Sequence, residues 1–471
     1  MTTFATFPSE TASKRELIVL TAPAGAPAIA LETLGPDVNA LLETKGARMR
    51  PLFGPASGIS EEGAPSVVPQ THGLDARRFF YVDAADAELD ELAAALRDNG
   101  AVSAAYVKPR GEPPTLNAMV ASGPPAPAAM TPDFSPRQIY RLAAPAGIDV
   151  NAAWSLAGGR GSGVSIIDLE WNWELAHEDL GGVSVVVGSA TGNPDHGTAV
   201  AGVLVGADNG FGVSGISPDA TLRFGAFSIP SAQAIDQAAA LLSAGDILLL
   251  EIHRAGPRHQ FQPRQDQRGY IAIEWWPDDF VAIEAAVRKG IIVVEAAGNG
   301  GEDLDDVLYD TPDPGFPAGW TNPFRRTTVD CGAILVGAGA PPPGTHGRSH
   351  GRDRSRLSFS NHGSAIDAQG WGREVTTTGY GDLQSGASTV LYTDEFSGTS
   401  SASPIIAGAL ACVQGIRIAN GNARLDSWQS RQALRSTGSP QQSATAGAAV
   451  TERIGNRPNL NQLIAFSATI P

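Results

Sequence analysis

The sequence predicts an α/β protein: a mostly parallel sheet covered by helices on both faces, preceded by a small α+β domain. Beyond residue 136, continuous apolar strands alternate with helix patterns, which is typical of parallel sheets. Before residue 110, strand and helix patterns form a separate block. The stretch between them is rich in Pro and Ala and has no periodicity. We therefore expect an α+β domain at 1–110, a linker at 111–135 and the main domain at 136–471.

Strand and helix patterns alternate in both blocks. In the first, apolar runs predict strands at 16–24, 78–83 and 101–107, and periodic stretches predict helices at 37–45 and 86–98. In the main domain, strands are predicted at 163–168, 246–252, 291–298 and 333–338. Helices are predicted there at 196–206, 231–244, 278–289 and 400–416. A helix between successive strands is the connection that a parallel sheet requires.

Composition narrows the function classes. Of the 471 residues, 33 are Lys or Arg and 49 are Asp or Glu, so the formal net charge is −16. Nucleic acids and anionic membranes attract basic surfaces, so neither is expected as a partner. No uncharged apolar stretch has the length of a membrane-spanning helix. The two cysteines, Cys331 and Cys412, lie in apolar stretches and are interpreted as buried free thiols.

The N-terminal segment has no apolar core of the length found in secretory signal peptides. Two cysteines also cannot form a disulfide framework, which suits a reducing compartment. We expect the chain to accumulate in the cytoplasm, with any export following a route that does not read a signal peptide.

Three polar residues stand at places suited to catalysis. Asp168 ends an apolar strand, and sites in α/β sheets form at the carboxyl ends of strands. His196 begins a helix of small residues, which permit close packing. Ser400 follows Gly398-Thr399 at the start of another such helix, where free backbone amides favour negative charge. Taken singly, Asp168 is more often a cap or turn residue, and Ser400 an ordinary N-cap.

Asn299 follows a buried strand within a Gly-Asn-Gly turn and, alone, is a turn residue. If the chain catalyses acyl transfer, its side-chain amide is a second donor for the negative charge on the attacked carbonyl. A serine hydroxyl is a weak nucleophile until a base takes its proton, and that base needs the right tautomer. The four segments together therefore indicate acyl transfer.

These segments resemble the subtilisin-like (subtilase) serine peptidases. The resemblance spans about 137–430 and rests on GSGVSIID, DHGTAVAG, EAAGNGG and GTSSASP. It implies a subtilisin-like fold and a serine endopeptidase that hydrolyses peptide bonds through an acyl-enzyme. The implied roles are Ser400 as nucleophile, His196 as general base, Asp168 as its orienting carboxylate, and Asn299 with the Ser400 amide as oxyanion hole. Protein or peptide substrates are the implied partners, and no cofactor is required.

Neighbouring segments depart from the family pattern. Leu169-Glu170 stands where the family usually has a small pair, which alters the hydrogen bonding around Asp168. In the strand that pairs with substrate, Glu251, Ile252 and His253 replace the usual Ser-Leu-Gly. The other cleft residues that the resemblance implies are Ala296, Ala297 and Gly298. Insertions at about 254–277 and 302–325 are expected to flank the cleft.

The N-terminal block resembles, in pattern and position, the inhibitory propeptide of subtilases. We expect it to inhibit this chain, with residues 106–110 lying along the cleft like a substrate. The alternative is an unrelated binding domain. An acidic loop after the Asn299 turn is a candidate for structural calcium, as in relatives, or a solvated loop; it contains Glu302, Asp303, Asp305 and Asp306.

Two other functions stay open. A transpeptidase or macrocyclase on the same fold would pass the acyl group to an amine instead of water. A catalytically silent binding protein is the second, although filled catalytic positions argue against it. A zinc peptidase is disfavoured because His177-Glu178 lacks the second histidine of His-Glu-x-x-His.

Overall fold

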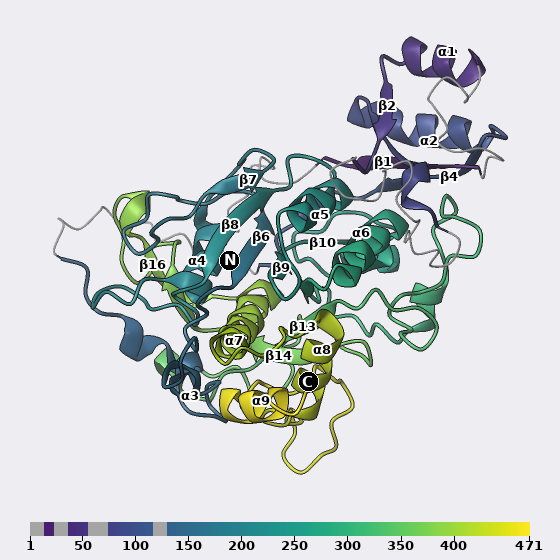
Figure 1. Cartoon of the computed structure of the whole chain (residues 1–471). Coiled ribbons are helices and arrows are strands. Elements are labelled where there is room, and N and C mark those ends of the chain that lie inside the picture. Colours follow the sequence, from purple (N-terminus) through teal and green to yellow (C-terminus); the bar gives the residue numbers. More distant parts are fainter. Residues whose placement is uncertain (1–13, 23–35, 55–73, 116–129) are drawn as a thin grey trace, which may run out of the picture.

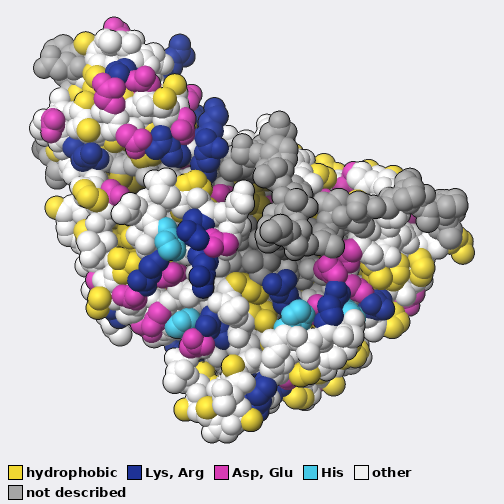
Figure 2. All heavy atoms as spheres, turned by 180° about the vertical axis from the view of Figure 1, so that it is seen from behind, with side chains coloured by type: hydrophobic (Ala, Val, Ile, Leu, Met, Phe, Trp, Pro, Cys, Tyr) yellow, Lys and Arg dark blue, Asp and Glu magenta, His cyan; other side chains and the backbone are white. Residues whose placement is uncertain are grey.

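The structure, a computed structural model, describes residues 14–22, 36–54, 74–115 and 130–471 (Figure 1). A small N-terminal module stands at one corner of a larger body. Figure 2 shows the same module as a lobe on which acidic and basic side chains lie side by side. Some of these charges pair across the module's surface, as Arg15 does with Asp86 and Lys45 with Glu91.

The module is an antiparallel sheet backed by two helices. Its strands are β1 (Glu16–Thr21), β2 (Arg48–Pro51), β3 (Phe79–Asp83) and β4 (Val102–Lys108), in the order β2-β3-β1-β4. Its helices are α1 (Pro36–Thr44) and α2 (Leu89–Arg97). Strand β2 was not predicted, because Arg-Met-Arg-Pro has no apolar run and only Met49 of the four residues is buried.

The body is built on a seven-stranded sheet whose described pairings are all parallel. The strand order is β14-β13-β12-β9-β6-β8-β7. The strands are β6 (Ser165–Glu170), β7 (Val185–Val187), β8 (Thr221–Ala226), β9 (Ile247–Leu250), β12 (Ile292–Ala296), β13 (Ile334–Gly339) and β14 (Ala368–Trp371). This confirms the predicted α/β architecture.

Helices cover both faces of this sheet. One face packs against α3 (Val150–Trp154), α4 (Asp195–Val205), α7 (Thr399–Ala419), α8 (Ser427–Ser436) and α9 (Leu460–Ser467). The other packs against α5 (Ser231–Ala240) and α6 (Pro277–Arg288). The same apolar cluster continues into the module through Ile18, Phe79 and Tyr106, so α5 and α6 lie between the two sheets (Figure 1).

Two small sheets lie beside the main one. The first has the order β11-β10-β5 and joins β5 (Gly111–Glu112), β10 (His253–Ala255) and β11 (Tyr270–Ala272). The second pairs β15 (Val375–Thr378) with β16 (Tyr392–Phe396). Strand β5 comes from the predicted linker, whose residues 116–129 lie outside the described part of the chain.

Two expectations from the sequence concern the cysteines and membrane-spanning helices. Cys331 and Cys412 are buried and free, as predicted. Among the helices of the described residues, α7 alone is long and apolar enough to cross a membrane, but 89% of its most apolar window is buried inside the protein. The helix therefore belongs to the core, where it packs across the sheet beside β12, β13 and β14.

Candidate active site

Helix α4 holds His196 rigidly at its second position. A Cβ atom on Gly202 would lie 2.4 Å from the hydroxyl oxygens of Thr377 and Thr378, so only glycine allows this close approach. Those two hydroxyls donate to α4 carbonyl oxygens over 2.7 and 2.6 Å. The small residues of the helix thus bring it against β15, and His196 is buried at its end.

Helix α7 brings Ser400 to the same place. Gly398 precedes the helix with φ of 109°, a conformation that residues with a side chain rarely adopt. Ser400 is the second residue of α7, where backbone N–H groups have no partner within the helix. Its Oγ lies 2.9 Å from His196 Nε2, and Ser400 is fully buried.

The carboxylate beside His196 is Glu170, and this corrects the expectation that Asp168 would orient the imidazole. Glu170 Oε1 forms a short hydrogen bond with His196 Nδ1, and its Oε2 accepts from the backbone N–H of Trp171 over 3.1 Å. Asp168 Oδ2 instead accepts from Trp173 Nε1 over 3.2 Å. Strand β6 continues two residues beyond its predicted end, and residues i and i+2 of a strand share a face.

Trp173 occupies the space beside the histidine helix. A Cβ atom on Gly197 would lie 2.6 Å from Trp173 Nε1, so the glycine after His196 makes room for the indole. The indole also stacks on Phe224, with ring centroids 4.3 Å apart. The unusual Trp171-Asn172-Trp173 segment therefore holds Asp168 in place through a neutral donor.

Three buried carboxyl side chains meet behind the serine, and we call Asp168, Glu170 and Glu251 the acid cluster. Burial, together with the charge of Glu170, raises the pKa of Asp168 well above its ordinary value. Burial and the neighbouring Asp168 likewise raise the pKa of Glu251. One oxygen of Asp168 and one of Glu251 are buried without a described hydrogen-bond partner. Both groups therefore favour the neutral form, and Glu170 is the carboxyl group of the three that faces His196.

Asn299 lies against the start of α7 with a fixed amide. Its Oδ1 accepts from the backbone N–H of Thr399 over 2.9 Å, and its Nδ2 donates to Gln267 Oε1 over 3.1 Å. A Cβ atom on Gly398 would lie 3.2 Å from Asn299 Nδ2. The amide nitrogen therefore points toward the chain turn that leads into Ser400.

A segment of the chain itself reaches the serine. Strand β5 pairs with β10 in antiparallel register, with Glu112 opposite His253. Two residues later, the carbonyl oxygen of Pro114 lies 2.6 Å from Ser400 Oγ. The same oxygen would lie 2.1 Å from a Cβ atom on Gly398. A backbone carbonyl thus occupies the space between Ser400 and the Gly398 turn.

Comparison with known proteins places this geometry in a family. The model of the subtilase family matches residues 187–456, which is more than half of the chain. The chain belongs to the subtilase family. The match includes His196, Asn299 and Ser400 but begins after β6, the strand that carries the carboxylates. The protein is a serine peptidase of this family.

Individual subtilases are distant from this chain. Subtilisin E of Bacillus subtilis (strain 168) is 25% identical over 371 residues, which cover 76% of this chain and 77% of that protein. Subtilisin Savinase of Lederbergia lenta is 27% identical over 263 residues, covering 54% of this chain and 77% of that protein. The solved structure of the epidermin leader peptide processing serine protease (EpiP) from Staphylococcus aureus has a TM-score of 0.53 and 15% identity, covering 97% of this chain and 99% of that one. This last likeness shows a shared fold.

The module meets the peptidase body through buried charges, which we call the interface cluster; it contains Glu16, Lys108, Arg254, Asp278 and Asp279. Lys108 Nζ lies 2.6 Å from Asp278, 2.8 Å from Asp279 and 2.9 Å from Glu16. Arg254 pairs with Glu16 over 2.5 Å. Burial alone favours neutral Glu16, but Arg254 and Lys108 outweigh it and lower its pKa. The charges are therefore paired across the boundary.

Ser231 belongs to this boundary rather than to a helix cap. It is the first residue of α5, with Pro230 at the cap position, and no side-chain cap is formed. Its hydroxyl donates to Asp279 over 2.6 Å and accepts from Lys108 over 2.8 Å. The Ser231 hydroxyl thus joins helix α5 to Lys108 of the module.

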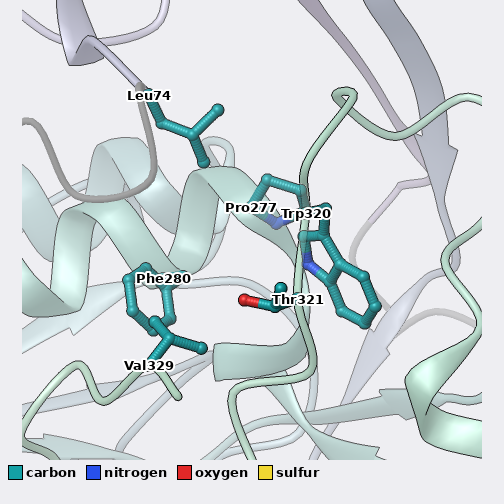
Figure 3. A pocket seen from close by; sticks show the side chains of 6 residues that line it. All are labelled: Leu74, Pro277, Phe280, Trp320, Thr321 and Val329. Atoms are coloured by element: carbon teal, nitrogen blue, oxygen red, sulfur yellow. The ribbon is translucent and has the colours of Figure 1, made fainter.

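Apolar contacts continue the same boundary. Tyr106 packs edge-to-face on Phe316 with ring centroids 4.8 Å apart, and its hydroxyl donates to Asp278 over 2.9 Å. Figure 3 shows a small pocket near the start of α6, lined by Leu74, Pro277, Phe280, Trp320, Thr321 and Val329. Its walls come from the module and from the body, so the pocket belongs to their boundary and not to the serine.

The other residues that the sequence predicts at the cleft lie in different surroundings. His253 lies in β10, opposite the chain's own Glu112, and burial lowers its pKa to about 3, so its imidazole is neutral. Glu251 lies behind the serine, where it accepts from Ser403 Oγ. Ile252, Ala296 and Ala297 are fully buried, and Gly298 donates its N–H to Thr399 Oγ1 over 3.2 Å.

The acidic loop does not fit a calcium site. Arg258 pairs with Glu302 over 2.9 Å and with Asp306 over 2.5 Å, so a cation already neutralises these carboxylates. Asp305 accepts from the hydroxyl of Ser364 over 2.6 Å. Among the described residues, no group of three or more His, Cys, Asp or Glu side chains is arranged to hold a metal ion.

Sequence reasoning missed Glu170, Gln267 and Tyr270. The signal for Glu170 was its place two residues after Asp168 on an apolar strand, because a slightly longer strand puts both on one face. Gln267 and Tyr270 lie in the insertion at 254–277, where the sequence shows no pattern. Their place at the cleft follows only from the folded chain.

Proposed function

We propose that the chain is an endopeptidase in which Ser400, His196 and Glu170 form the catalytic triad. The observation that carries the proposal is the continuous set of contacts from Glu170 through His196 to Ser400, with a peptide carbonyl already at the serine. Glu170 holds the proton on His196 Nδ1, which leaves Nε2 as the acceptor for the serine proton.

The reaction follows from these positions. Ser400 Oγ attacks the peptide carbonyl carbon while His196 Nε2 takes its proton, and Glu170 stabilises the imidazolium that forms. Asn299 Nδ2 and the Ser400 backbone N–H bind the resulting oxyanion. His196 then protonates the leaving amine, which gives an acyl-enzyme. Water attacks this ester with His196 as base and restores the free serine.

The decisive experiment is Ser400→Ala. The variant should fold like the wild type, since it loses only one hydroxyl, but hydrolyse no peptide and take up no fluorophosphonate probe. Mass spectrometry of the products of the wild type separates hydrolysis from transfer to an added amine. Full peptidase activity in the variant would contradict the proposal, and a wild type that neither labels nor cleaves would indicate a silent binding protein.

We also propose that the N-terminal module inhibits the same site. The supporting observations are the buried interface cluster and the strand β5, which carries Gly111–Glu112 onto β10 and Pro114 to the serine. The segment in contact with the cleft runs from Gly111 to Pro114, rather than over the 106–110 that the sequence predicted. A tethered segment competes at an effective concentration of order mM, so modest affinity keeps the cleft filled.

A further inference from the structure

The turn from Arg264 to Tyr270 lies beside the segment that occupies the cleft. Gln267 donates from Nε2 to the carbonyl oxygen of Pro113 over 3.0 Å. Tyr270 donates its hydroxyl to Glu112 Oε1 over 3.0 Å. One side chain of the turn thus contacts backbone that any peptide offers, and the other contacts a side chain specific to this segment.

The Tyr270 hydroxyl is held as a donor. The residue is fully buried, its ring lies against His253 with centroids 4.6 Å apart, and the backbone N–H of Arg264 donates to the hydroxyl oxygen over 3.2 Å. This hydrogen bond uses one lone pair of the Tyr270 hydroxyl oxygen, so the phenolic proton points toward a different partner. Burial and the nearby carboxylate raise the pKa of Tyr270, so the phenol keeps its proton. A carboxylate is the acceptor that such a fixed donor favours.

Both burial and several donors act on the Glu112 carboxyl group. Burial is the larger influence and raises the pKa of Glu112, and the hydrogen bonds from Tyr270 and Gln267 and the charge of Arg110 offset it only in part. The neighbouring His253 is neutral and therefore adds no cation. A lysine side chain at this position would place its ammonium group against the Tyr270 hydroxyl and Gln267 Nε2, which both act as donors here, and this is unfavourable.

Gln267 has a second contact that ties it to the reaction. Its Oε1 accepts from Asn299 Nδ2 over 3.1 Å, so one amide side chain joins the bound backbone to the proposed oxyanion donor. Gln267 is buried and has φ of 52°, a conformation that few residues other than glycine adopt. The turn is thus shaped to place this amide at the cleft.

We propose that this turn determines substrate specificity: Gln267 binds the main-chain carbonyl two residues before the cleaved bond, and Tyr270 selects a carboxylate side chain three residues before it. The substrate class is therefore peptides with Glu or Asp at that third position. The inference rests on the proposed function, since the positions are counted from the carbonyl at Ser400. Gln267 has a second role as well, since it positions the side chain of Asn299.

The test uses the full chain and acetyl-Gly-X-Pro-Z-coumarylamide peptides, with Z an equal mixture of residues and X either Glu, Gln, Ala or Lys. The ratio of two kcat/KM values on one preparation does not depend on how many clefts the module fills. We expect Glu to exceed Ala by at least about tenfold, which corresponds to about 1.4 kcal/mol, and to exceed Lys by more. Equal rates for Glu, Ala and Lys would overturn the proposal.

Tyr270→Phe should reduce the ratio of Glu to Ala to below about threefold, because the ring remains and only the donor is lost. Tyr309→Phe is the matched control, since its buried hydroxyl donates to Glu302 over 2.6 Å outside the cleft. That control should keep the full ratio. A ratio that survives in Tyr270→Phe would assign the preference to another group and overturn the role of Tyr270.

Gln267→Ala separates the two roles within the turn. It should lower kcat/KM by a similar factor for every X, with the loss partly in kcat because Asn299 is no longer held. A loss confined to the Glu peptide would contradict the backbone role. Fluorophosphonate labelling of Ser400 reports on the proposed function independently: labelling without any preference at X refutes this inference alone, and failure to label refutes the catalytic proposal itself.

Discussion

The acid cluster and the interface cluster are both buried, yet their charges are arranged in opposite ways. In the interface cluster, Lys108 and Arg254 lie among three carboxylates, and each cation has a short contact with an anion. In the acid cluster, which contains Asp168, Glu170 and Glu251, the one ion pair among the described residues is that of Glu170 with His196. In the interface cluster two cations hold two parts of the chain together, and burial raises the pKa of Asp279 only to about 7. In the acid cluster burial raises the pKa of both Asp168 and Glu251 well above their ordinary values.

The comparison teaches that burial alone does not decide which acid is ionised. A buried carboxylate stays charged where a cation or several donors face it and takes up a proton where they do not. Glu170 forms hydrogen bonds with the His196 imidazole and with a backbone N–H, whereas Asp168 accepts a hydrogen bond from one indole N–H. Glu170 is the carboxyl group that contacts His196, although Asp168 is the residue that matches the family motif. Three substitutions test this comparison and a fourth tests the oxyanion donor, in order of decreasing effect.

Glu170→Gln is the most damaging change to the acid cluster. An amide at this position cannot stabilise the imidazolium and permits the wrong histidine tautomer. We expect kcat to fall by about 10⁴-fold, the loss found when the triad carboxylate of a serine protease becomes an amide. Steady-state kinetics measures it. A larger loss in Asp168→Asn than in Glu170→Gln would restore Asp168 as the orienting carboxylate.

Lys108→Met breaks the interface cluster by leaving three buried carboxylates with one cation. Removing one partner of a buried ion pair costs about 3–5 kcal/mol. That loss weakens the module's hold by roughly 10²–10³-fold. The rate at which fluorophosphonate labels Ser400 in the full chain should rise accordingly. Lys45→Met, which removes a lysine on the outer surface of the module, is the control and should label at the wild-type rate.

Asn299→Ala removes one proposed oxyanion donor. We expect kcat to fall by about 10²–10³-fold with little change in KM, because the amide meets the oxyanion only as charge develops. This magnitude is that of the corresponding donor in subtilisin and is carried over by analogy. Kinetics on one peptide separates kcat from KM. A loss wholly in KM would mean that Asn299 only shapes the turn.

Asp168→Asn should have the smallest effect on activity, within a few-fold, because the carboxyl is already held neutral. Its effect on stability depends on pH. The raised pKa of Asp168 means that the folded state binds its proton more tightly, so stability from this group is present at low pH and is lost as pH rises. The melting temperature of Asp168→Asn, relative to that of the wild type, should therefore rise steadily from pH 4 to pH 9. A constant difference across that range would contradict the neutral state of Asp168.

The architecture and most of the active site follow from local sequence patterns. Apolar runs separated by helical periodicity predict a parallel sheet, because both faces of each strand must be buried. The small residues of α4 and α7 mark helices that pack closely, and they carry His196 and Ser400 at their first turns. These features depend on neighbours within a few residues, so they can be read along the chain.

Which carboxylate faces the histidine, and what fills the cleft, depend on contacts between distant segments of the folded chain. Asp168 and Glu170 are two residues apart on one face of β6, and the choice between them depends on Trp173, Gly197 and the direction of the imidazole. Likewise, Gly111–Glu112 become a strand only by pairing with β10, about 140 residues away. Contacts between distant segments set the local charge balance, and no local pattern encodes them. For that reason the sequence predicted the nucleophile and its base, while packing selected their partner.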